Sequence, residues 1–369
     1  MSVSAADLHV PGLESRISPG LEAVERQLTG AVSSSRDLVD ELTAHLSAAG
    51  GKRLRPLLTL VCAQLGRPEL ALGERVITGA TAVELTHLAS LYHDDVMDSA
   101  PTRRGVPSAQ RLWGNNRAIL AGDVLFARAS KLVASLGPEM GTRHAVTFER
   151  LCTGQLNETF GPVPGQDPVE FYLRVLADKT GSLVSSAAAF GALLADAGAF
   201  VGDVVAEFGE RVGVAFQIAD DVLDLASSGG QSGKTPGTDL REGVDTMPVL
   251  LLRKALAAGE LDAAGQSILS RLSTGNLNDD AVLADVVARL RLHPVLARTR
   301  EMAMTWAREA VGVLAGLEDA VRAGTRRRLD ATGADEVERR AALADAEQRV
   351  ELVREGMEEF ARLLVDRAA

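Results

Sequence analysis

Two clusters of aspartates in this sequence share one spacing, in which two adjacent carboxylates are followed three residues later by a third. The clusters are Asp94, Asp95 and Asp98, and Asp220, Asp221 and Asp224. On a helix, residues four apart share a face, so the first and third aspartates lie together, while the middle one lies about 100° round the helix. Crowded carboxylates need a cation, and all-oxygen ligands favour Mg²⁺, which typically bridges carboxylates to a diphosphate.

Basic residues supply the second kind of chemistry. The candidate anion-binding residues are Lys52, Arg55, Arg103, Arg104, Lys179 and Lys234. The first two belong to the run GGKRLRP, where glycines precede a helix that Pro56 can start, and such a place binds anions. Any one of these cations would ordinarily be a solvated surface group. Together with paired aspartates in a chain of net charge −11, they predict two diphosphate sites, one bridged by metal and one purely basic.

The elements that must position these residues are predicted to be helices. Apolar residues recur every three or four positions along 76–98, 119–136, 172–194 and 204–225. No stretch combines strict alternation with β-branched residues, and aromatic residues make up only 4% of the chain. The sequence therefore predicts an all-α protein.

The breaks between these helices are short and rich in glycine, at 50–51, 161–168 and 227–243. None resembles an interdomain linker, so a single domain over residues 1–369 is predicted. The segment 324–354 is dense in charge of both signs and is predicted to be a charged helical insertion on the surface.

Composition narrows the class of protein. A hydrophobic content of 46% with 24% charged residues is typical of a globular protein, and the net charge of −11 argues against nucleic acid as a partner. No signal peptide is evident, and the apolar stretch 187–205 contains two aspartates, which favours a buried helix over a transmembrane segment. Cys62 and Cys152 lie in apolar runs and are predicted to be buried, so a cytoplasmic protein is expected.

Taken with these residues, the motifs resemble those of the trans-isoprenyl diphosphate synthases, the polyprenyl synthetase family. In order between residues 47 and 252 they are GGKRLRP, HDDVMD, RRG, GDVLFA, LADKTGSL, FQIADDVLD and GKTPGTDL. The resemblance implies an isoprenoid synthase fold, a bundle of roughly ten or more helices around a deep central cavity. It also implies a homodimer that condenses isopentenyl diphosphate with an allylic diphosphate, with a product that can associate with membranes.

The same resemblance implies roles for particular residues. Three Mg²⁺ ions would be ligated by Asp94, Asp98 and Asp220, with Asp95, Asp221 and Asp224 in supporting positions of the metal site. The allylic diphosphate would be bound by Arg103, Lys179 and Lys234. Isopentenyl diphosphate would be bound by Lys52, Arg55, His87 and Arg104. The developing carbocation would be faced by Thr180 and Gln217.

The sequence differs from the pattern of this family at one position, and two alternative functions remain to be considered. Val244 stands where the family often has a second lysine in its closing loop, so closure of this loop would depend on Lys234 alone. A class I terpene cyclase would share the aspartates but would need no second diphosphate site. A non-catalytic subunit of a heteromeric synthase would tend to lose aspartates, whereas both clusters here are complete.

The helix that leads to Asp94 bears on product length. The residues that precede the aspartates are small, namely Val83, Thr86, Ala89 and Ser90, where short-chain members of the family tend to carry an aromatic floor. One helical turn rises about as far as one isoprene unit, so three or more open turns predict a product of about six to ten units. The alternatives are a farnesyl or geranylgeranyl product, and small residues that serve only close helix packing.

Overall fold

The computed structural model describes residues 5–33, 37–226 and 236–366. These residues are almost entirely helical, and the strands among them form one hairpin of two-residue strands, so the predicted all-α class is confirmed. Within this part of the chain, no helix combines the length and apolar character that crossing a membrane requires.

The chain forms two compact units. Unit 1 consists of Met1–Glu149, Ser182–Glu210 and Ala310–Phe360, and unit 2 of Arg150–Gly181, Arg211–Glu309 and Ala361–Ala369. Four helices contribute residues to both units, namely α7 (Pro138–Phe160), α10 (Ala199–Ala226), α15 (Pro294–Val313) and α17 (Glu336–Val365).

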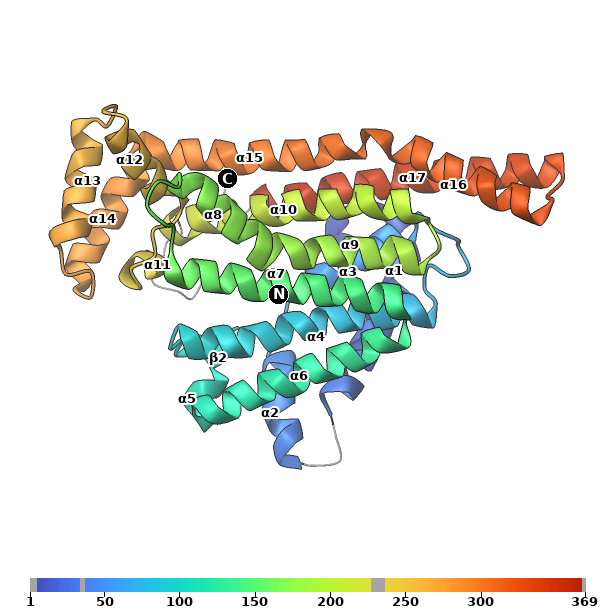
Figure 1. The fold of residues 1–369 in the computed structure, drawn as a ribbon, viewed down its shortest axis with the longest axis horizontal. Helices are drawn as coiled ribbons and strands as arrows, with labels where there is room; N and C mark the ends of the chain where they lie inside the picture. Colours follow the sequence, from blue (N-terminus) through green and yellow to red (C-terminus); the bar gives the residue numbers. More distant parts are fainter. Residues whose placement is uncertain (1–4, 34–36, 227–235, 367–369) are drawn as a thin grey trace. The chain divides into compact units, whose positions relative to one another are not determined.

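Unit 1 is built around α4, a helix with a long run of buried residues. The other elements that lie wholly within this unit are η1 (Ala5–Leu8), α1 (Pro11–Val32), α2 (Asp37–Ala48), α3 (Leu54–Ala63), β1 (Thr102–Arg103), β2 (Val106–Pro107), α5 (Ala109–Trp113), α6 (Asn115–Ser135), α9 (Ser182–Leu194), η3 (Leu314–Gly316) and α16 (Leu317–Thr332). The helix α4 (Glu74–Met97) packs against α1, α3, α6 and α9, and Figure 1 shows α4 and α6 side by side.

The apolar stretch 187–205 is mostly α9, which packs closely against α3. A Cβ atom on Gly191 would lie 2.0 Å from the Thr59 carbonyl oxygen, so only glycine permits this approach. The stretch then turns at Asp196 and Gly198, both with positive φ, before α10 begins. The expectation of a buried helix in this stretch is therefore met by α9.

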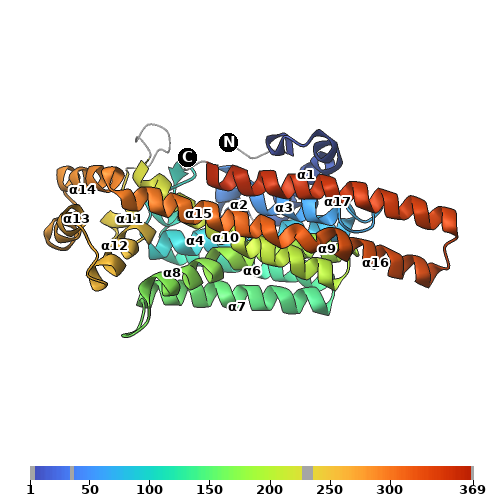
Figure 2. The ribbon, with the colours of Figure 1, turned by 90° about the horizontal axis from the view of Figure 1, so that it is seen from above.

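The charged segment 324–354 is helical, because it includes the end of α16 and most of α17. Figure 2 shows these two helices running side by side to the turn that joins them. Arg349 is buried and donates hydrogen bonds to the carbonyl oxygens of Gln64, at 2.7 Å, and Gly66, while Val353 is fully buried. The part of the segment beyond Asp345 is thus tied to the core of unit 1, whereas most of 326–345 is exposed or half-buried.

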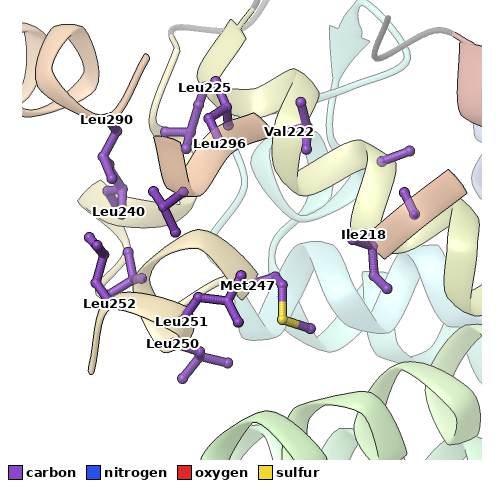
Figure 3. Close-up of a cluster of buried hydrophobic side chains, with 14 of the residues drawn as sticks. Ile218, Val222, Leu225, Leu240, Met247, Leu250, Leu251, Leu252, Leu290 and Leu296 are labelled. Atoms are coloured by element: carbon purple, nitrogen blue, oxygen red, sulfur yellow. The ribbon is translucent and has the colours of Figure 1, made fainter. Parts of the chain in front are cut away.

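Unit 2 holds the end of α10 in a buried apolar cluster. The elements that lie wholly within this unit are α8 (Pro168–Leu176), η2 (Ala177–Gly181), α11 (Thr238–Arg241), α12 (Met247–Ala257), α13 (Ala263–Thr274) and α14 (Asp280–Leu292). Figure 3 shows Ile218, Val222 and Leu225 of α10 in this cluster, together with leucines from α11, α12, α14 and α15.

Three local expectations differ from the structure. The predicted continuous helix over 172–194 is broken at Ala177–Gly181, which forms a π-helical turn. The predicted loop 227–243 contains the short helix α11, although its residues 227–235 lie outside the described part of the chain. Cys62 is buried as predicted, but Cys152, on α7, is exposed.

Candidate active site

The end of α4 in unit 1 carries the first aspartate cluster. Asp94 is half-buried, Asp95 is fully buried, and Asp98 is the exposed C-cap of the helix. The Nε atom of Arg103 donates to Oδ1 of Asp95 over 2.6 Å, yet burial raises the pKa of Asp95. Oδ2 of Asp95 is buried and has no hydrogen-bond partner among the described residues. A buried carboxylate oxygen of this kind, beside two further carboxylates, fits a bound cation.

The two arginines that follow this cluster have different partners. Arg103 ends β1 and Val106 begins β2, with Arg104 and Gly105 as the two turn residues, both at positive φ, as a tight hairpin requires. Arg103 binds Asp95, whereas Arg104 donates to the carbonyl oxygens of Leu46, at 2.8 Å, and Gly50. The turn therefore directs adjacent guanidinium groups to different neighbours.

Arginines gather around His87 in unit 1. Arg53 donates to the buried Glu84 over 3.1 Å. Burial, against the opposing charge of Glu84 and with a smaller contribution from the charge of Arg104, lowers the pKa of Arg55 to about 10. The buried Nε of Arg55 has no hydrogen-bond partner in the described part of the chain. Burial, and then the charge of these arginines, lowers the pKa of His87 well below its ordinary value, so this histidine is neutral. Arg53 also pairs with Glu25 at 2.5 Å, so the three arginines face two glutamates. Positive charge still exceeds negative charge here, and a bound anion would balance it.

The glycine loop before α3 makes this arrangement possible. A Cβ atom on Gly51 would lie 2.7 Å from an Arg53 guanidinium nitrogen and 2.9 Å from the Arg104 guanidinium, so a side chain there would displace both groups. Lys52 is half-buried on this loop. The helix begins at Leu54, two residues before the predicted start at Pro56, and Arg53 caps it with φ of 51°.

The end of α10 in unit 2 carries the second cluster. Asp220 and Asp224 are half-buried, while Asp221 is buried and accepts hydrogen bonds from Tyr172 and from the backbone of Met247. The apolar side chains of Ile218, Val222 and Leu225, which flank this cluster on α10, belong to the core shown in Figure 3. The middle aspartate thus differs from its two neighbours in burial and in the partners that the structure gives it.

The π-helical turn η2 carries Lys179 and Thr180 in unit 2. Lys179 Nζ lies 2.5 Å from Oε2 of Glu158, and Arg150 Nε lies 2.8 Å from Oδ1 of Asp178. Between these two pairs, a Cβ atom on Gly154 would lie 2.8 Å from the backbone nitrogen of Lys179. Residues 150, 154 and 158 share one face of α7 and together fix η2. Sequence reasoning missed Glu158 and Arg150, and their four-residue spacing around a glycine was the available signal.

The other predicted residues of the site are placed as follows. Thr180 is buried and Gln217 is half-buried on α10. Lys234 lies outside the described residues. Val244 is exposed to 38%, beyond the short helix α11.

The predicted chain-length residues all lie on α4 and are enclosed. Val83, Thr86 and Ala89 are fully buried, and Ser90 is 9% exposed. Ala89 belongs to a buried cluster with Ala118, Ala121 and Leu125 of α6. A Cβ atom on Gly122 of α6 would lie 2.4 Å from Nε2 of His93 and 3.2 Å from the Ala89 carbonyl oxygen, so α6 approaches α4 closely here. At Ala89, therefore, the small side chain also serves the close packing of α4 on α6.

Metal binding by protein ligands alone is not seen in the described residues, where no three histidine, cysteine or acidic side chains form a set that could hold an ion. Mg²⁺ usually takes only one or two carboxylates and completes its shell with water and substrate phosphate oxygens. The aspartate pairs and the unsatisfied oxygen of Asp95 fit that mode of binding.

The fold and these motifs define a class of helical proteins with aspartate-rich and arginine-rich sites, and the comparisons with known proteins give its family. The sequence model of the family described as polyprenyl synthetase matches residues 36–276. The chain is 42% identical to nonaprenyl diphosphate synthase of Mycobacterium tuberculosis over 318 residues, which cover 86% of this chain and 92% of that protein.

Two solved structures are also similar. A polyprenyl synthase from Caulobacter crescentus, complexed with calcium and isoprenyl diphosphate, matches with a TM-score of 0.75 and 27% identity, covering 100% of this chain and 99% of that one. A geranylgeranyl pyrophosphate synthase from Corynebacterium glutamicum, with the same ligands, matches with a TM-score of 0.71 and 37% identity, covering 93% and 98%.

The chain belongs to the polyprenyl synthetase family. The family predicted from the motifs is therefore confirmed, and so is the isoprenoid synthase fold.

Proposed function

We propose that this chain is a trans-prenyltransferase that condenses isopentenyl diphosphate with an allylic diphosphate to make a long-chain polyprenyl diphosphate. The observation that carries this proposal is the group of Arg53, Arg55 and Arg104 around a neutral His87, with Glu84 buried among them. This group is a second place for an anion, apart from the aspartates. The likeness to nonaprenyl diphosphate synthase supports the long-chain assignment.

The aspartates are assigned to the allylic diphosphate. Asp94, Asp98 and Asp220 would ligate Mg²⁺, and diphosphate oxygens and water would complete the coordination of each ion. When bound, these ions would withdraw charge from the departing diphosphate. The binding of calcium and isoprenyl diphosphate by the two similar structures supports a divalent ion beside a diphosphate.

Basic side chains complete the hold on the two substrates. Arg103 and Lys179, with Lys234, would bind the allylic diphosphate and stabilise the charge that develops on it as the bond breaks. Lys52, Arg55, His87 and Arg104 would hold isopentenyl diphosphate, so that its double bond meets the carbocation, a proximity effect. A neutral His87 would donate a hydrogen bond to that diphosphate without adding charge.

Groups near the reacting carbons would protect the carbocation. Thr180 and Gln217 supply oxygen atoms that can face a positive charge, and apolar side chains would exclude water that would quench it. The proton lost at the end of each condensation would go to the released diphosphate. We place the enzyme in the cytoplasm as a homodimer.

A class I terpene cyclase is the second candidate, because it would also use metal-bound aspartates. It would need no second anion site, so the arginines around His87 count against it. A non-catalytic subunit is the third, and the two complete aspartate clusters count against that.

One assay separates these three functions. The purified chain alone, with Mg²⁺, farnesyl diphosphate and labelled isopentenyl diphosphate, is expected to incorporate the label into a lipid product, and EDTA should abolish incorporation. A cyclase would consume farnesyl diphosphate without isopentenyl diphosphate, and a non-catalytic subunit would consume neither.

Lys52→Ala is expected to raise the KM for isopentenyl diphosphate by about ten- to a hundredfold, the equivalent of one charge-assisted hydrogen bond, and to change the KM for the allylic substrate much less. Arg104→Ala should act in the same direction, with some loss of stability because it also removes donors from two backbone carbonyls. Steady-state kinetics with each substrate varied in turn measure this, and Arg111→Ala, at an exposed arginine of α5, is the control. An effect confined to the allylic substrate would contradict the division of the two arginines.

A further inference from the structure

Asp221 is bound by protein donors from two other helices of unit 2. The hydroxyl of Tyr172, on α8, lies 3.1 Å from Oδ1 and 3.0 Å from Oδ2 of Asp221. The backbone N–H of Met247, the first residue of α12, donates to Oδ2 over 3.0 Å. Asp221 is only 6% exposed. Both of its oxygens are therefore already engaged within the protein.

The contacts of Asp221 with Tyr172 and Met247 are those of a carboxylate that accepts hydrogen bonds to stabilise the fold. The first N–H groups of a helix have no partner within it and form its positive end, so Asp221 accepts one of these N–H groups of α12, which offsets part of the cost of its own burial. A carboxylate has about four acceptor positions, and the one hydroxyl hydrogen of Tyr172 and the one N–H of Met247 occupy two of them. Asp220 and Asp224 are half-buried on the neighbouring faces of α10 and do not share this enclosure.

Tyr172 also lies close in sequence to the turn that carries Lys179. The helix α8 ends at Leu176 and continues directly into η2, so Lys179 follows Tyr172 by two turns. Tyr172 packs against the buried cluster of unit 2, to which Leu176 and Val222 belong. A bond from Tyr172 to Asp221 therefore ties the segment that carries Lys179 to the end of α10 that carries the other two aspartates.

We propose that Tyr172 is a positioning residue of the diphosphate site, which acts through Asp221 to hold Lys179 and the outer aspartates of α10 in place. In this arrangement Asp221 is a structural acceptor and not a metal ligand. The inference rests on the proposed function, since it concerns the same site, and it adds Tyr172 and the start of α12 to the parts that this site requires.

Tyr172→Phe removes only the hydroxyl and tests the proposal. It is expected to lower kcat about tenfold, with the KM for isopentenyl diphosphate almost unchanged, because that substrate has its own site. The affinity for inorganic diphosphate in the presence of Mg²⁺, measured by calorimetry, should fall by a similar factor. Asp279→Ala, which removes the N-cap of α14, is the control: it should lower Tm but leave kcat and diphosphate affinity unchanged.

A Tyr172→Phe variant that loses only Tm, as the control does, would overturn the proposal. A second pair of variants decides the matter even if Tyr172→Phe does not fold. Asp221→Asn keeps one acceptor oxygen and should weaken the binding of Mg²⁺ and diphosphate only about threefold, whereas Asp220→Asn should weaken it by about a hundredfold or more. Equal losses would make Asp221 a ligand. A wild-type chain that makes no prenyl product would instead contradict the proposed function, so the two failures are distinguishable.

Discussion

Asp94→Ala and Asp220→Ala are each expected to lower kcat by at least about 10³-fold while the protein remains folded. The proposed Mg²⁺ ions interact most strongly with the diphosphate as it departs, so losing a ligand should affect turnover more than substrate binding. Both carboxylates are half-buried at the end of a helix, which means that alanine leaves no large cavity in the core. Steady-state kinetics at saturating Mg²⁺, with circular dichroism to check the fold, measure this.

The matched control is Asp203→Ala, which removes an exposed carboxylate from α10, the helix that also carries Asp220. Its turnover should equal that of the unmodified chain. Near-normal turnover in either Asp94→Ala or Asp220→Ala would rule out the assignment of these aspartates to the metal.

Ala89→Phe is expected to shorten the product to about three or four isoprene units. The growing chain is proposed to run along α4 from the aspartates, and a phenylalanine one to two turns below Asp94 would close that path, since each turn rises about the length of one unit. Mass spectrometry of the product formed from farnesyl diphosphate measures the change.

The packing of Ala89 against α6 requires a second variant, because a large side chain there would displace part of that helix. Ser90→Phe places the same ring one residue further along α4, at a position with 9% exposure. Shortening by either folded variant would support the path along α4. Unchanged product length in both would contradict it and would leave close packing as the role of the small residues.

The helices and their order could be predicted because their burial follows a three- to four-residue period. The aspartate clusters and the basic motifs could also be predicted, since the residues of each motif are close together in the sequence. The break at Ala177–Gly181 could not be predicted, because the apolar period continues across it. That turn follows from contacts with α7, where Gly154 lets the backbone of Lys179 approach and Arg150 pairs with Asp178.

The partners of the site residues were the least predictable part. Glu158 is 21 residues from Lys179, and Tyr172 is 49 residues from Asp221, so neither pair is evident from a local pattern. The resemblance to a family gave roles to the residues that bind substrate, but it said nothing of the groups that hold those residues. Contacts between helices that are distant in the sequence supply that information.

The central claim is that this chain extends an allylic diphosphate with isopentenyl diphosphate to a long product. The most direct test is the mass spectrum of the product that the purified chain makes from farnesyl diphosphate, excess isopentenyl diphosphate and Mg²⁺. The account predicts a polyprenyl diphosphate of about six to ten isoprene units, the length that three or more open turns of α4 would allow. A product that stops at farnesyl or geranylgeranyl diphosphate, or a cyclised hydrocarbon, would contradict it.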